Sequence, residues 1–122
     1  MTRLIAPVLA LALAMLALPA HAQEAPAAPA LNLEQQMLLR CSAAFALGEH
    51  MQKAGEPEAA GWPPLAVRGR EFFVQSAARL MAEAQLSREQ ISALMMEAGQ
   101  DLAKDGQLVK VMPVCLQVAG LR

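Results

Sequence analysis

Two cysteines, Cys41 and Cys115, constrain the fold of this chain more than any other feature. The 122 residues contain no other cysteine, so an intramolecular disulfide can only join these two. Such a bond closes a loop of about 75 residues, for which the chain-entropy model gives roughly 4.5 kcal/mol of stabilisation. A small domain is typically stable by about 5–15 kcal/mol, so this bond would supply a large share. Whether it forms depends on the compartment.

The N-terminal residues are typical of an export signal. Arg3 precedes an apolar run at residues 4–18, Pro19 ends that run, and residues 20–22 form an Ala-His-Ala cleavage site. An uncleaved anchor is the alternative, but the run is shorter than the roughly 20 apolar residues that span a bilayer. We therefore predict a signal peptide at 1–22, a flexible Pro/Ala linker at 23–31, and a helical domain at 32–122. The mature protein is expected to be periplasmic or secreted, without a stable membrane anchor.

Export favours pairing, because cysteines in an oxidising compartment usually form disulfides. The alternative is a redox-active pair, which typically has C-x-x-C spacing with the attacking thiol at a helix N-terminus. Cys41 and Cys115 are far apart in the sequence, and Cys41 falls in the middle of a predicted helix. A structural Cys41–Cys115 disulfide is therefore the prediction.

Composition points to helices and away from nucleic acid. The formal net charge is −1 and no basic run stands out, so we expect no nucleic-acid partner. The chain has 3 Phe, 1 Trp and no Tyr, which leaves few rings for stacking. Alanine, leucine and methionine are abundant, and these residues favour helix.

Capping patterns place the first and third helices. Asn32 and Gln35 form a capping box for a helix that runs to Ala54, where Gly55 stops it. Ser87 and Gln90 repeat the pattern for a helix that ends near residues 105–106.

Two proline positions suggest the other helix starts. A helix is expected to begin at residue 64 or 65, with proline in its first turn. Pro113 is expected to open a short helix over 113–119, because proline breaks a hydrogen bond inside a helix. The predicted fold is all-α: a small three-helix bundle plus a short C-terminal helix, tied by one disulfide.

The sequence lacks the common catalytic and metal-binding motifs, so no catalytic residue, metal site or cofactor is predicted. His50 is the only histidine after residue 22, which excludes a poly-histidine zinc site. Methionine thioethers can bind Cu(I), which leaves a Met-rich copper protein open as an alternative. Helical cores also use methionine as filler, and we favour that interpretation for Met37, Met51, Met81, Met95, Met96 and Met112.

Some apolar positions exceed what one small core needs. They are the candidates for an apolar binding face, for another envelope protein or a second copy of the chain. The alternatives are that the C-terminal helix covers the part on the first helix, or that these residues are scattered over the surface. The residues are Leu39, Ala43, Leu47, Met81 and Met96.

The segments LLRCSAAFALGEH, WPPLAVRGREFF and VMPVC together resemble a family of small exported bacterial proteins with two cysteines and uncharacterised function. The resemblance spans about residues 33–118 and implies an all-helical fold. The predicted architecture is also similar in outline to small periplasmic acid-stress chaperones, which are helical with one disulfide. This likeness is an analogy of fold, which does not establish function.

The leading functional hypothesis is a non-enzymatic, exported helical binding or interaction module. The alternative is a holdase-like periplasmic stress chaperone. A Cu(I)-binding protein or an enzyme ranks below both.

Overall fold

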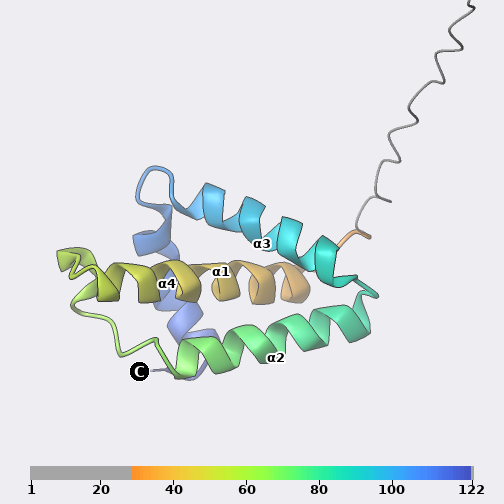
Figure 1. Ribbon diagram of the computed structural model, residues 1–122, viewed down its shortest axis with the longest axis horizontal. Helices are drawn as coiled ribbons and strands as arrows, with labels where there is room; N and C mark the ends of the chain where they lie inside the picture. The colour runs from red at the N-terminus through yellow and green to blue at the C-terminus, as the bar shows by residue number, and fades with distance from the viewer. Residues whose placement is uncertain (1–28, 122) are drawn as a thin grey trace, which may run out of the picture.

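The computed structural model describes residues 29–121, which fold into four α-helices and one short 3₁₀ helix without any β-strand (Figure 1). The predicted signal peptide and residues 23–28 of the predicted linker lie outside this range. The elements are α1 (Leu33–Lys53), η1 (Pro57–Ala59), α2 (Arg68–Glu83), α3 (Arg88–Leu102) and α4 (Gln107–Val118). None of these helices is long and apolar enough to cross a membrane.

Helix α1 is the centre of the domain. It packs against α2, α3 and α4, whereas α2 and α3 contact each other far less. In Figure 1, α2 and α3 flank α1 on opposite sides and α4 crosses behind it. The all-α prediction is therefore confirmed, with α1 as the common partner of the other three helices.

The capping boxes are confirmed at both predicted sites. The Asn32 side chain accepts from the Gln35 backbone N–H at 2.8 Å, and the Gln35 side chain accepts from the Asn32 N–H at 3.0 Å. Ser87 and Gln90 make the same reciprocal pair at the start of α3. Gly55 follows α1 with φ +71°, a left-handed conformation that glycine adopts without strain.

The predicted start of α2 at residue 64 or 65 is wrong, because the helix begins at Arg68. Leu65 is fully buried, and its backbone N–H donates to the side chain of Gln52 at 3.0 Å. This long-range contact fixes residues 63–65 outside the helix, and a turn at 66–67 then leads into α2.

The predicted short helix at 113–119 is also wrong, because α4 begins at Gln107 and runs through Pro113. Gly106, at φ +68°, turns the chain into this helix. Proline inside a helix costs one backbone hydrogen bond and causes a steric clash. Leu108, Met112 and Cys115 are all buried along one side of α4, and this burial offsets the cost.

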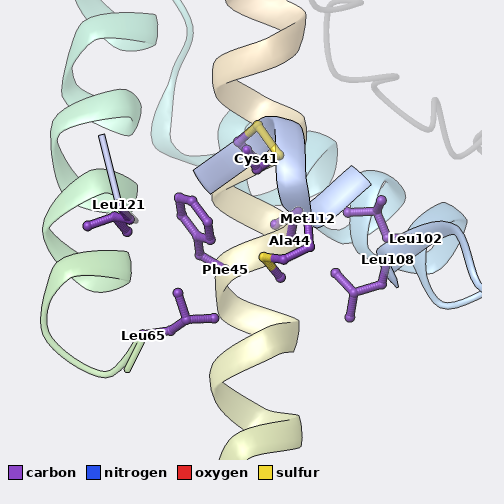
Figure 2. Packing of buried hydrophobic residues seen from close by; sticks show 10 residues of the cluster. Cys41, Ala44, Phe45, Leu65, Leu102, Leu108, Met112 and Leu121 are labelled. Atoms are coloured by element: carbon purple, nitrogen blue, oxygen red, sulfur yellow. A yellow bond between two sulfur atoms is a disulfide. The ribbon is translucent and has the colours of Figure 1, made fainter. Parts of the chain in front are cut away.

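The main core lies where α1, α4 and the segments beside them meet (Figure 2). Phe45 is buried at its centre and meets Phe72 edge-to-face, with ring centroids 5.2 Å apart. The labelled residues of this cluster are Cys41, Ala44, Phe45, Leu65, Leu102, Leu108, Met112 and Leu121.

A second, smaller cluster closes the other end of the domain. It joins Leu39 of α1 to Leu80, Leu86 and Ile91. Leu31 also packs against this cluster, so the packed domain begins inside the region predicted as linker.

The Cys41–Cys115 disulfide is confirmed and joins the middle of α1 to the second half of α4. The two Cα atoms are 5.1 Å apart, and both cysteines are 0% exposed. The sulfurs lie inside the core, as Figure 2 shows, where an attacking thiolate cannot reach them without unfolding. This position fits a structural bond.

Candidate functional site

Two residues of the predicted apolar face belong to the interior. Leu39 is 9% exposed and packs with Leu80 and Ile91. Ala43 is 4% exposed and lies in the main core. They were expected at the surface because the apolar positions exceed what one small core needs. Helix α1 is instead covered from three sides, so the prediction is wrong for these two positions.

The other three predicted residues do not gather in one place. Leu47 is half-buried and packs against the main core. Met81 on α2 is 39% exposed and Met96 on α3 is 66% exposed. The predicted face is therefore not continuous, and Met81 and Met96 are the exposed members of the set.

The structure instead places an apolar strip on α2, on the side that points away from α1. Gly69, Ser76 and Leu80 form the buried side of the helix. Residues seven apart on an α-helix lie within about 20° of each other around the axis. Val67 caps α2 with a helical backbone conformation, so this spacing relates it to Val74 and Met81. The three side chains are 67%, 60% and 39% exposed. Together with the exposed Ala78, we call them the outer face of α2.

Val67 and Val74 were missed by the sequence-based prediction. On this helix, that prediction named only Met81 as an exposed apolar residue. The signal was the seven-residue spacing of Val67, Val74 and Met81, opposite a buried side that has its own hydrophobic residues.

Charged groups flank the outer face at one level of the helix. Arg70 and Glu71 are consecutive, and at about 100° per residue they fall on opposite sides of the line from Val67 to Val74. A shallow hollow of about 370 Å³ lies among Val67, Arg70, Glu71 and Val74. A second hollow, of about 280 Å³, lies between Arg70 and α1 and has Phe45 and Phe73 in its lining. Arg70 thus separates two small depressions.

Ion pairs link α2 to α1 at both ends. Glu49 of α1 lies 2.7 Å from the Lys53 ammonium and 3.6 Å from the Arg70 guanidinium. Hydrogen bonding to Lys53, with attraction to Lys53 and Arg70, lowers the pKa of Glu49 although partial burial opposes the shift. Near the other end, Arg79 lies 2.7 Å from Glu34 and 2.8 Å from Glu83.

Other hollows are open grooves. One of about 370 Å³ lies between α1 and α3, with Leu39 and Leu94 in its lining and Arg40 and Glu97 among its polar residues. Another, of about 410 Å³, lies beside Trp62.

The arrangement of the described residues gives little support to a metal-binding site. Within residues 29–121, no three His, Cys, Asp or Glu side chains are placed to hold a metal ion. His50 is exposed at the end of α1. Met112 is fully buried, and Met37, Met51 and Met95 pack against the cores, so most of these methionines act as core residues.

Comparison of the chain with protein-family models, curated proteins and solved structures finds no match to any of them. The described residues therefore define a class by their own features: an all-helical domain, centred on α1, with one buried disulfide and an apolar strip on the outside of α2.

Proposed function

We propose that this protein is an exported, non-enzymatic binding module, and that the outer face of α2 is the surface that binds an apolar protein segment. The single observation that carries the proposal is the exposure of Val67 and Val74. The side of a helix opposite the core is normally polar, and here it carries the exposed Val67, Val74, Ala78 and Met81. Such a strip, with charged residues beside it, is typical of a surface that packs against another helix.

The small depressions beside Arg70 agree with this interpretation. They adjoin the apolar strip and share Arg70, so a helix lying along α2 could place side chains in them while its polar groups meet Arg70 and Glu71. The size of the surface favours a weak and reversible contact, because stable interfaces bury about 800 Å² on each partner.

Export is part of the proposal and is supported by the disulfide together with the signal-like sequence at residues 1–22. An oxidising compartment lets Cys41 and Cys115 pair.

Site-specific photo-crosslinking tests the binding surface. A benzophenone amino acid replaces Val74 in one variant and Met96 in another, because these apolar side chains are similarly exposed, at 60% and 66%, on different helices. Each oxidised protein is irradiated with an envelope extract from its own cells. We expect protein adducts, to foreign proteins or to a second copy, from position 74 and far fewer from position 96. Equal labelling at both positions, or none at position 74, would contradict the proposal.

The holdase alternative is favoured by one observation, the Glu49–Arg70 ion pair between α1 and α2. Protonation of Glu49 in acid removes this pair. A holdase would then expose core surface, so binding of a hydrophobic dye should rise steeply at low pH. A binding module of the proposed kind should instead use the outer face of α2 at neutral pH with its core closed.

A further inference from the structure

The outer face of α2 has a pattern that is complementary to itself. Three apolar residues recur at seven-residue intervals, which is the repeat of a helix packed along another helix in a coiled-coil-like manner. Ala78, between Val74 and Met81, is small enough to let a second helix approach closely.

The charges beside the strip depend on the direction of the partner helix. When two identical helices pack in parallel about a twofold axis, one flank of each helix meets the opposite flank of the other. Arg70 on one flank would then face Glu71 of the second copy, and symmetry would form this pair twice. Opposite charges at such flanking positions set both partner and orientation.

An antiparallel pair lacks this complementarity. Centred on Val74, it brings the same flank of both helices together, so Arg70 would face Ala77 and Glu71 would face Gln75 or Ala78. The charges then gain no partner. Both side chains are exposed and their ion pairs within the protein are long, with Arg70 3.6 Å from Glu49 and Glu71 3.5 Å from Arg68.

We infer that the occupant of the outer face of α2 is a second copy of this chain, packed in parallel, with Val67, Val74 and Met81 in the seam and reciprocal Arg70–Glu71 ion pairs beside it. This inference rests on the proposed binding surface and names its partner. The contact is a weak one, because one strip of partly exposed side chains provides only part of the area of a standard interface.

Single-cysteine cross-linking tests the geometry. The two native cysteines are paired and buried, so an introduced cysteine is the only reactive thiol. Val67→Cys, Val74→Cys and Met81→Cys are each treated with a short bis-maleimide at roughly 100 µM or above, a concentration suited to a weak interface. A parallel pair cross-links each variant to itself. An antiparallel pair would instead join position 67 to position 81 in a mixture, and that result would overturn the inference.

Charge exchange provides a second, independent readout. In Val74→Cys protein, Arg70→Glu alone places two carboxylates opposite each other, and Glu71→Arg alone places two guanidinium groups opposite each other. Each single variant should therefore dimerise less. A mixture of the two variants restores both opposite-charge pairs, and we expect mixed cross-links to recover at least several-fold at low salt. Failure of the mixture to recover would overturn the inference.

The two proposals fail differently. If position 74 labels foreign proteins but no variant cross-links to itself, the surface binds but its partner is another protein, and the second-copy inference is wrong. If position 74 labels nothing, the proposed binding surface itself is wrong. Val74→Lys should raise the dimer dissociation constant at least about tenfold, whereas Met96→Lys should leave it unchanged; loss of one tightly packed apolar contact corresponds to a factor of this size.

Discussion

The side chain of Gln52, near the end of α1, hydrogen-bonds to the backbone at Leu65, thirteen residues later in the sequence. Its Oε1 accepts from the Leu65 N–H at 3.0 Å, while its Nε2 donates to the carbonyls of Pro63 at 2.9 Å and Trp62 at 3.3 Å. One amide group thus satisfies three backbone groups of the connection between α1 and α2. This contact keeps Leu65 in the core and delays the start of α2.

Replacement of Gln52 should loosen this connection. Gln52→Leu removes all three hydrogen bonds, and at about 1 kcal/mol for each one it should lower the free energy of unfolding by roughly 2–3 kcal/mol. Gln52→Glu should cost more at neutral pH, because a carboxylate would face two carbonyl oxygens. Urea unfolding followed by the fluorescence of Trp62, the single indole, measures both effects.

The Gln52→Glu variant should also depend on pH in a defined direction. Only the protonated carboxyl can donate to the carbonyls, so folding should raise the pKa of this group. The loss of stability caused by Gln52→Glu should then be absent below the ordinary glutamate pKa of about 4.3 and grow as pH rises above it. A penalty that is equal at pH 4 and pH 7 would show that the carbonyls are not its neighbours.

The disulfide should dominate the response of stability to redox conditions. Cys41→Ala with Cys115→Ala should lower the free energy of unfolding by about 2–5 kcal/mol, the usual range for a native disulfide in a small domain. Alanine is chosen instead of serine, because serine would bury two unpaired hydroxyl groups at positions that are 0% exposed. Thermal unfolding of the oxidised protein, with and without reductant, measures the same effect. Equal melting temperatures in both conditions would show that the bond adds nothing.

Two helical glycines should respond in opposite ways to alanine. A Cβ on Gly48 would lie 2.7 Å from Leu65 Cδ1 and 2.8 Å from Met112 Cε, and both of these side chains are fully buried. A Cβ on Gly99 in α3 would meet nothing within 4 Å. Gly99→Ala should therefore stabilise the protein by about 0.5–1 kcal/mol. Gly48→Ala should be less stable than Gly99→Ala by at least about 1 kcal/mol because of overpacking. Denaturant unfolding of both variants under the same conditions tests this order of stability.

Pro113 offers a stabilising substitution. It is exposed on the outer side of α4, so its ring adds little to the core. Pro113→Ala restores a backbone donor inside the helix and should raise the free energy of unfolding by about 1–3 kcal/mol. Denaturant unfolding measures the change, with the disulfide intact. A loss of stability would mean that Pro113 itself helps to bring Cys115 to Cys41.

Acid should weaken the link between α1 and α2 through Glu49. The pKa of Glu49 is lowered in the folded protein, mainly by hydrogen bonding to Lys53. Its contribution to stability is therefore present above the ordinary glutamate pKa and is lost as pH falls through the lowered folded value. Glu49→Gln should destabilise the protein at pH 7 and have little effect at pH 3. Glu58→Gln, at an exposed position on η1, is the control and should leave the free energy of unfolding unchanged at both pH 7 and pH 3.

The sequence by itself determined the features that depend only on neighbouring residues, and the disulfide, for which only one pairing was possible. Asn32 and Ser87 start helices because their side chains accept from the backbone three residues on. The disulfide needed no structure to identify it, because Cys41 had one possible intramolecular partner. Leu38, Cys41 and Phe45 are spaced three and four residues apart, as residues on one side of a helix are, and all three are buried.

The tertiary structure decided what depends on contacts between distant segments. Burial on α4 outweighs the local penalty of Pro113, and the Gln52 side chain holds Leu65 outside α2. Leu39 and Ala43 became core residues because three helices cover α1. The outer face of α2 emerged for the same reason: helical spacing shows which residues share a side of a helix, but packing alone decides which side is left exposed to solvent.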